Sequence, residues 1–461
     1  MSLKKSNQSL QFVLRAGVLL GLAVSAAACS GESGTEESVG SSSAAVTLNN
    51  VTRENFDNQG RQGNGSSFTP SISGNQRYVV FSSEANSWAP TVDNNGLSDV
   101  YLKDRQTGAI TLVSAANGVV GNGESFNASV ADNGTVVFES TATNLAAGAT
   151  NPSNKILARA IDGTISRVDV SLAGQANGIS SRPKISGNGA FAIFESDAAN
   201  LVAGDTNNTT DVFVRTLSSN AVARVSVTVG NAQANGASFL GTISYDGQVV
   251  AFSSDASNIQ FNDGNGQTDV FARNLTTGVT SVVSFSTTGM GGAVGNGLST
   301  APQISGNGAF VSFLSRSTNW DAADTNGVTD VYVKGVGAGG APSRVSVSSA
   351  GAQANAESTA SAISYDGSLV AFVSAASNLV TGDTNGLADA FVRDRNALST
   401  ARVDQLGSTQ ANGGVGSSGL RFSGNPSAPG ASFLVFDSTA SNLTFGDTNN
   451  VSDVFSASIS L

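Results

Sequence analysis

The segment "GDTNGLADAFV", residues 382–392, places two carboxylates and an amide at fixed spacing on a glycine-broken loop. Asp383, Asn385 and Asp389 stand at the first, third and seventh positions of this loop. Oxygen ligands around such a sharp turn are typical of calcium loops, but Ca²⁺ takes about six to eight oxygens. Water or a neighbouring amide would have to complete the site. The affinity expected for a site of this kind is on the order of 10⁻⁴ to 10⁻³ M.

The loop recurs, and its copies give the full set of candidate calcium ligands. The other sets are Asp93, Asn95 and Asp99; Asp205, Asn207 and Asp211; Asp263, Asn265 and Asp269; Asp324, Asn326 and Asp330; and Asp447, Asn449 and Asp453. The alternative is that these side chains accept hydrogen bonds from backbone N–H groups and hold the turn. A further copy, "ATNPSNKILARA", favours this alternative, because Ala149 and Lys155 replace its two carboxylates.

The elements that must position these loops repeat with them. The last loop residue recurs at spacings of 56 to 64 residues, which gives seven units when Lys155 is included. Each unit also has an apolar run that ends in phenylalanine, and the seven are Phe81, Phe138, Phe194, Phe252, Phe313, Phe372 and Phe436. A third mark, of the "QANG" type, recurs at Asn64, Asn122, Asn177, Asn235, Asn296, Asn355 and Asn412. We interpret these asparagines as buried amides that tie each connection to the next unit, with ligand binding as the alternative.

Each unit has the pattern of four short strands. In the copy that begins "SAISYDGSLVAFVS", strand a is followed by a hairpin turn and strand b, the aspartate loop leads into strand c, and "TARVDQL" is strand d. No useful helical periodicity follows residue 28. Four strands in a repeat of this length indicate a β-propeller blade. The sequence therefore predicts an all-β, seven-bladed propeller of four-stranded antiparallel blades.

The two ends of the repeat array predict how the ring closes. The last unit stops after strand c, whereas residues 44–55, "AAVTLNNVTREN", precede the first strand a without a blade of their own. We expect this first strand to complete the seventh blade, which leaves no long sheet edge unpaired.

The stretches "ISYDGSLVAFVS" and "DTNGLADAFVRD" resemble the TolB-like propeller repeats, a family related in outline to the WD repeats. The resemblance covers about residues 50–461 and implies a propeller that works in the bacterial cell envelope through partner proteins. TolB has a separate amino-terminal α/β domain, whereas here the first blade directly follows a tether. Membership of the Tol-Pal system is therefore not expected.

The amino terminus predicts export. Lys4, Lys5 and Arg15 precede a short apolar run, and small residues stand between that run and Cys29, the single cysteine. This resembles a bacterial lipoprotein signal, which implies cleavage after residue 28, lipidation of Cys29 and, with Ser30 next, delivery to the outer membrane. Ordinary secretory cleavage that leaves a free thiol is the alternative. Residues 29–43 are a predicted flexible Ser/Gly/Glu tether, and residues 44–461 a single propeller domain.

The charge and the missing histidine exclude several functions. Without residues 1–28 the chain has 20 Lys and Arg against 34 Asp and Glu, so nucleic acid is not an expected partner. The absence of histidine excludes Ser-His-Asp and Cys-His nucleophiles and histidine-bound zinc. Carboxylate chemistry remains, and it would show as departures from the repeat. The candidates are Arg182 and Lys184 in "SRPKIS", together with Lys155, each more simply interpreted as a surface variation.

The sequence thus predicts a non-catalytic propeller that is anchored by a lipid to the outer membrane, on the periplasmic side or at the cell surface. We expect it to be a monomer that binds a protein or glycan partner. The alternative is a carboxylate-dependent carbohydrate hydrolase or lyase. Trp88 and Trp320 could stack on sugar rings, although the leucines and isoleucine at the position equivalent to Trp320 indicate a loop anchor.

Overall fold

The computed structural model describes residues 47–88, 93–149, 152–172, 174–259, 263–287, 294–427 and 432–460. Residues 44–461 form one compact unit. The predicted signal segment, the lipidated Cys29 and the tether lie outside the described residues. No helix in the described ranges is long and apolar enough to cross a membrane.

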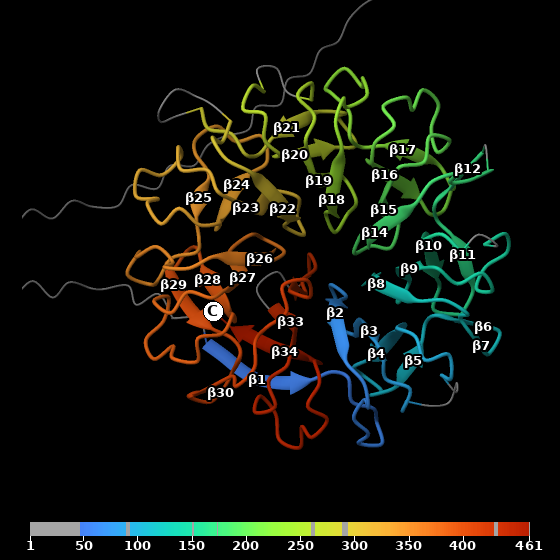
Figure 1. Cartoon of the computed structure of the whole chain (residues 1–461), viewed down its shortest axis with the longest axis horizontal. Coiled ribbons are helices and arrows are strands. Elements are labelled where there is room, and N and C mark those ends of the chain that lie inside the picture. Colours follow the sequence, from blue (N-terminus) through green and yellow to red (C-terminus); the bar gives the residue numbers. More distant parts are fainter. Residues whose placement is uncertain are drawn as a thin grey trace, which may run out of the picture. The chain divides into compact units, whose positions relative to one another are not determined.

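The described chain folds into seven four-stranded antiparallel sheets arranged as the blades of a propeller (Figure 1). Strands a are β2 (Ser67–Ile72), β8 (Ser125–Val130), β14 (Ser180–Ile185), β18 (Ser238–Ile243), β22 (Ser299–Ile304), β26 (Ser358–Ile363) and β32 (Arg421–Phe422). Strands b are β3 (Tyr78–Ser83), β9 (Val136–Ser140), β15 (Phe191–Ser196), β19 (Val249–Ser254), β23 (Phe310–Ser315), β27 (Leu369–Ser374) and β33 (Ser432–Ser438).

The two outer positions of the blades complete the sheets. Strands c are β4 (Asp99–Asp104), β10 (Lys155–Arg159), β16 (Asp211–Thr216), β20 (Asp269–Asn274), β24 (Asp330–Gly335), β28 (Asp389–Asp394) and β34 (Asp453–Ser460). Strands d are β5 (Ile110–Leu112), β11 (Ile165–Arg167), β17 (Val222–Arg224), β21 (Thr280–Val282), β25 (Ser343–Arg344), β29 (Ser399–Arg402) and β1 (Thr47–Arg53). Short ribbons in three d–a connections pair β6 (Ala115–Ala116) with β7 (Val119–Val120), β12 (Val170–Ser171) with β13 (Gly174–Gln175), and β30 (Gln405–Leu406) with β31 (Thr409–Gln410).

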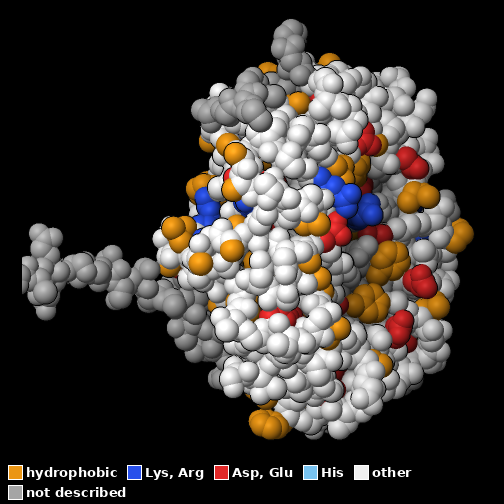
Figure 2. Space-filling model, turned by 60° about the vertical axis from the view of Figure 1, so that its left-hand side comes forward, with side chains coloured by type: hydrophobic (Ala, Val, Ile, Leu, Met, Phe, Trp, Pro, Cys, Tyr) orange, Lys and Arg blue, Asp and Glu red, His pale blue; other side chains and the backbone are white. Residues whose placement is uncertain are grey.

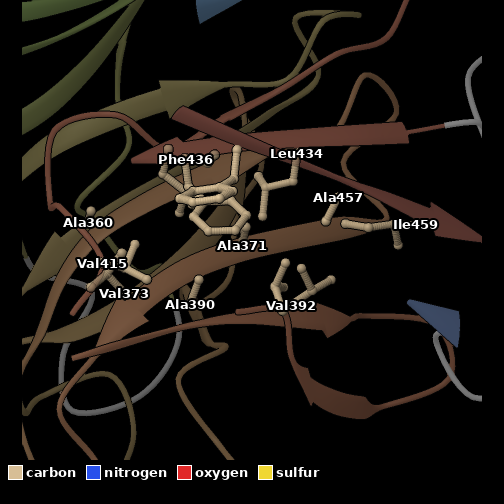
Figure 3. Packing of buried hydrophobic residues seen from close by; sticks show 14 of the residues in the cluster. Ala360, Ala371, Val373, Ala390, Val392, Val415, Leu434, Phe436, Ala457 and Ile459 are labelled. Atoms are coloured by element: carbon tan, nitrogen blue, oxygen red, sulfur yellow. The ribbon is translucent and has the colours of Figure 1, made fainter. Parts of the chain in front are cut away.

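The core lies between blades because strands b and c are apolar on both faces. β3, β19 and β27 are buried along their whole length, as expected for strands that pack against a sheet on each side. Figure 3 shows one such interface, where Leu434 and Phe436 of the seventh blade face Ala371 and Val373 of the sixth. Repetition of this contact around the ring buries a separate cluster at each boundary.

The ring closes as the sequence predicts. β1 pairs antiparallel with β34, so the first strand is strand d of the seventh blade. The buried Asn55 follows β1; its amide donates to the Asp453 carboxylate and, over 3.1 Å, to the hydroxyl of Ser67. The Asn55 amide oxygen accepts the backbone N–H of Val454 at 3.3 Å. Residues from both ends of the propeller therefore share one buried hydrogen-bond network.

Backbone hydrogen bonds also connect the a–b turns of neighbouring blades. The N–H of Asp132 donates to the Gly187 carbonyl at 3.0 Å, and that of Tyr245 donates to the Gly306 carbonyl at 2.8 Å. Equivalent bonds run from Asn188 to Tyr245 and from Asn307 to Tyr365. We call the face that carries the a–b turns the hairpin face, and the opposite face, with the b–c loops and d–a connections, the loop face.

We expect Asn55→Ala to destabilise the protein more than Ser226→Ala, which removes the equivalent side chain of the third blade. Ser226 donates to Asp211 at 2.6 Å, and its loss should cost about 1 to 3 kcal/mol because buried partners are left unsatisfied. Asn55→Ala removes similar local bonds and also releases β1, so urea unfolding should show a larger decrease in the free energy of unfolding for this variant. Limited proteolysis of the same variant should show new cleavage near residues 47–66. Equal losses with no new cleavage would show that this network does not hold the ring closed.

Candidate functional site

The aspartate loops hold themselves and the adjacent connection together. In each of the six loops the asparagine amide nitrogen donates to the last aspartate, and the six distances range from 2.7 to 3.2 Å. The same nitrogen donates to a carbonyl of the following d–a connection, as Asn326 does to Ala354 at 3.0 Å. The asparagine oxygen accepts a backbone N–H two residues later, as from Leu387 to Asn385 at 3.0 Å. These bonds are those of an Asx turn.

Four of the loops already contain a cation between their two aspartates. Arg402, at the end of β29, lies 3.4 Å from both Asp383 and Asp389. Arginines occupy the same place in three other blades, where Arg53 contacts Asp447 and Asp453, Arg224 contacts Asp205 and Asp211, and Arg344 contacts Asp324 and Asp330. In these four blades an arginine from strand d therefore supplies the positive charge that a calcium ion would bring to the loop.

The aspartate loops of the first and fourth blades lack this arginine. Leu112 and Val282 stand at the equivalent positions of β5 and β21, and no ion pair reaches Asp99 or Asp269 among the described residues. Burial raises the pKa of both carboxyl groups to about 6, and hydrogen bonds from the neighbouring serine and asparagine partly oppose that increase. Calcium binding stays a prediction. The arginine contacts in the other four loops restrict it to the loops of the first and fourth blades.

The described residues contain no group of three or more acidic, cysteine or histidine side chains placed to hold a metal. Because the asparagines present nitrogen toward the carboxylates, we expect 10 mM calcium to leave the Tm within about one degree of a chelator-treated sample. A calcium site with a Kd near 1 mM would instead stabilise the protein by about 1.4 kcal/mol at that concentration. A clear rise in Tm that is lost in Asp99→Asn or Asp269→Asn would place calcium in these loops.

The second blade exchanges the charges of this motif. Lys155 replaces the strand c aspartate and is fully buried, so the interpretation of Lys155 as a surface variation is wrong. Its ammonium donates to the carbonyls of Ser140 and Ala142 at 3.2 and 3.0 Å. The carboxylate of this blade instead belongs to Asp169, two residues beyond strand d, and pairs with Arg167 at 2.8 Å. The blade can accommodate a buried lysine because an acid, Asp169, stands at the position after strand d where other blades have a serine.

The sixth blade instead carries a second acid. Asp404 replaces the serine found in four other blades, is fully buried, and accepts the N–H of Ala390 at 3.0 Å. Burial, together with the adjacent Asp389, raises the pKa of Asp404 well above its usual value. We infer that one proton shared by these two carboxyl groups replaces the proton that a serine hydroxyl donates in four other blades.

We expect Asp404→Ser to stabilise the protein at pH 7.5 by roughly 1 to 3 kcal/mol, because serine satisfies Asp389 without a second buried acid. A carboxyl whose pKa is raised by folding binds its proton more tightly in the folded state. Its presence therefore costs stability as the pH rises above about 4, the unfolded value. The advantage of the variant should thus shrink toward pH 4.5 in urea unfolding. Asp404→Asn, which copies Asn55 of the seventh blade, should show the same pH dependence as Asp404→Ser. A loss of stability at pH 7.5 in both variants would contradict the proposed pairing of Asp404 with Asp389.

The "QANG" asparagines are exposed rather than buried, contrary to the sequence interpretation. Each joins a d–a connection to the b–c loop of the blade that follows. In the second blade the N–H of Asn122 donates to the amide oxygen of Asn144 at 3.0 Å. The side-chain amide of Asn122 donates to the Thr143 hydroxyl and accepts the Thr143 backbone N–H. Asn144 completes the clamp through a bond to the Val120 carbonyl at 2.9 Å. The clamps fix the loop face as a firm rim of amide and hydroxyl groups.

Trp88 and Trp320 are core residues. Trp88 packs edge-on against Tyr101 with ring centroids 5.1 Å apart, and Trp320 packs in the same way against Tyr332 at 5.4 Å. Both indoles are more than nine-tenths buried, so neither offers an open face on which a sugar could stack. The prediction that Trp320 anchors the loop is confirmed.

A channel lined by the seven strands a contains the residues that depart most from the repeat. The second-last positions of these strands line the channel, and they are Ser71, Ser129, Lys184, Thr242, Gln303, Ala362 and Arg421. Lys184, Gln303 and Arg421 also line a second chamber of about 230 Å³ that opens toward the loop face. We call these three residues the waist. On its other side lies a chamber of about 140 Å³ that extends toward the hairpin face.

Among the described residues, no carboxylate lies within ion-pair distance of the two cations of the waist. Lys184 has no carboxylate within 4 Å, and the Arg421 guanidinium donates to the carbonyl of Leu420 at 2.7 Å. Burial and the nearby Arg421 lower the pKa of Lys184 to about 7, and burial lowers that of Arg421 to about 10. The sequence singled out Lys184, which lies in the channel rather than on the outer surface. It did not single out Arg421, although comparison of strand a positions would have found it.

Carboxylates on strand b hold the channel wall beside the waist. Each strand a from the first to the fifth blade has a bulge at which a residue other than glycine adopts a positive φ, as Arg182 does at 48°. The Glu139 carboxylate accepts the N–H of Arg182 at 2.6 Å, and Glu195 accepts the N–H of Leu240 at 2.6 Å. Glu195 also pairs with the Arg182 guanidinium at 3.0 Å. The bulges turn the side chains of Asn127, Arg182, Leu240 and Ala301 into the lining of the loop-side chamber.

No family model matches this chain, and no curated protein matches it. Among solved structures it is similar to the β-propeller domain of the Trilobed protease from Pyrococcus furiosus, with a TM-score of 0.50, 9% identity, and 85% of this chain and 93% of that chain covered. That domain is described as having an open velcro topology, whereas here β1 closes the ring.

Two further solved structures are more weakly similar. An oligogalacturonate lyase from Vibrio parahaemolyticus gives a TM-score of 0.48 at 11% identity, over 90% of this chain and 98% of that chain. A putative TolB from Agrobacterium tumefaciens gives 0.38 at 12% identity, over 64% of this chain and 83% of that chain. These likenesses agree on a β-propeller that is distantly similar to TolB, and at such identities they show the fold alone.

Proposed function

We propose that this chain is a non-catalytic binding module, anchored by a lipid in the bacterial cell envelope, that receives an envelope protein or glycan at the loop-face mouth of its channel. The observation that carries the proposal is the loop-side chamber, which residues from six of the seven blades line. The amide clamps and the blade-to-blade hydrogen bonds around it form a firm frame. A site that is ordered before its ligand arrives loses less entropy on binding.

The state of the acidic groups favours binding over catalysis. The loop carboxylates accept hydrogen bonds from the loop asparagines and pair with arginines or serines, and Glu139 and Glu195 beside the channel accept backbone N–H groups. A hydrolase that uses two carboxyl groups needs both of them to face the substrate in unlike environments. Figure 2 shows a face on which charged side chains are sparse and most of the surface is uncharged, which also suits recognition by hydrogen bonds.

We expect Ser418→Trp to abolish ligand capture and Ser219→Trp to leave it intact. Ser418 is exposed and lines the loop-side chamber, so an indole there should block the mouth. Ser219 is equally exposed but lies in the turn between β16 and β17 on the hairpin face. The full exported chain would be used to screen a glycan array and to capture proteins from a detergent extract of envelopes.

A ligand that both tryptophan variants retain does not bind at the channel mouth, and that result would contradict the proposal. Turnover of an acidic or neutral polysaccharide by the wild-type chain would favour the hydrolase or lyase alternative instead. The hydrolase and lyase assays belong on the same preparation, because a true binding module should release no product from any ligand that it captures.

A further inference from the structure

We propose that the waist of the channel binds the anionic group of an acidic sugar, a carboxylate or a sulfate, that enters from the loop face. This inference rests on the proposed function and names the class of ligand for the same site. It begins from the seven equivalent strand a positions, five of which carry small or uncharged side chains. Only Lys184 on the third blade and Arg421 on the seventh bring positive charge to this level of the channel.

These two cations have no structural task that the described contacts reveal. Arginines elsewhere on this chain neutralise paired aspartates, as Arg402 does, or hold carbonyl groups at blade boundaries, as Arg215 does for Val168 at 3.1 Å. Lys184 has no ion pair, and the hydrogen bond of Arg421 goes to the carbonyl of its own neighbour. Removing a cation from bulk water without a counterion is costly, so an anion that reaches both would be bound favourably.

The surrounding acids limit the charge that the ligand can carry. Glu139, Glu195 and Asp437 lie on three strands b next to the waist, and burial raises the pKa of Asp437 to about 6. Glu139 and Glu195 attract the Lys184 ammonium, but neither carboxylate comes within the 4 Å of an ion pair. Three basic groups, with Arg182 included, thus meet three acidic ones. A group with a single negative charge suits this balance better than a doubly charged phosphate monoester.

The shape of the channel indicates the direction of entry and the size of the ligand. Tyr245 and Tyr365 narrow the hairpin-side chamber, with ring centroids 6.0 Å apart, and hydrogen bonds connect the turns around them. The loop-side chamber is wider and is lined by small groups, which include Gly241, Ala360 and Ser361. A chamber of about 230 Å³ admits one or two sugar rings and excludes a folded partner.

The neutral lining matches a sugar better than a peptide. Residues that carry hydroxyl or amide groups line the loop-side chamber, and they are Asn127, Gln303, Thr359, Ser361 and Ser417. Such groups form both donor and acceptor hydrogen bonds with sugar hydroxyls. The anionic group would then sit at the waist, where an arginine can bind a carboxylate or sulfate with two N–H groups and a lysine adds a point charge.

The test measures binding of glucuronate and of glucose 6-sulfate to the full chain by calorimetry, beside glucose and a glutamate-rich peptide. We expect both acidic sugars to bind, more weakly as salt increases. The double variant Lys184→Met, Arg421→Met should weaken their binding at least about tenfold, the effect of one lost charge-assisted contact. Arg316→Met removes an exposed cation from the same face outside the channel and should leave binding unchanged.

The double variant should keep or raise the Tm, because it removes two half-buried cations that have no carboxylate within ion-pair distance. If it does not fold, Lys184→Gln with Arg421→Gln replaces it. Equal binding of glucose, binding of the peptide alone, or no effect of either double variant would overturn the proposal. Absence of acidic-sugar binding while Ser418→Trp still abolishes envelope capture would overturn this inference alone. Binding of acidic sugars without any envelope capture would leave it standing and refute the broader function.

Discussion

A buried carboxylate at the loop-face end of each blade is the interaction on which the rest of the structure depends. In four blades the first residue of strand c accepts a serine hydroxyl from the end of strand d over 2.5 to 2.6 Å. The same carboxylate accepts the asparagine amide of its loop, and the serine oxygen accepts a strand c N–H. One buried acid thus joins strand c, strand d and the b–c loop.

Three blades, the second, sixth and seventh, lack the serine-to-aspartate hydrogen bond, and each has other polar groups at the same positions. The second blade has Lys155 at the start of strand c and an acid, Asp169, two residues beyond strand d, whereas the sixth has an acid at both places. The seventh uses Asn55 from the other end of the chain, so that the same contact closes the ring. In the seventh blade a donor and an acceptor again meet at the start of strand c, whereas in the second blade Lys155 and Asp169 each have a partner of their own. Both arrangements avoid an unsatisfied buried charge, which is costly.

A ring held in this way explains why the channel can carry unusual charges. The apolar clusters between blades and the bonds between a–b turns supply the stability, so the inward positions of strand a are free of structural demands. Proteins tend to place strained backbone and poorly neutralised charge at functional sites, where a rigid frame can support them. The bulges with positive φ and the cations Lys184 and Arg421 occupy the same stretch of the channel.

The sequence by itself determined the fold, the number of blades and the closing strand, because a repeated pattern of apolar runs and turns reports on local structure seven times over. It could not distinguish a calcium loop from an Asx turn, since both require the same oxygen-bearing side chains at the same spacing. Only the tertiary structure decided that Arg402 and its equivalents reach the aspartates, because they arrive from a different strand. It also decided that Lys184 and Arg421 share one channel, because residues of the third and seventh blades meet only when the ring is closed.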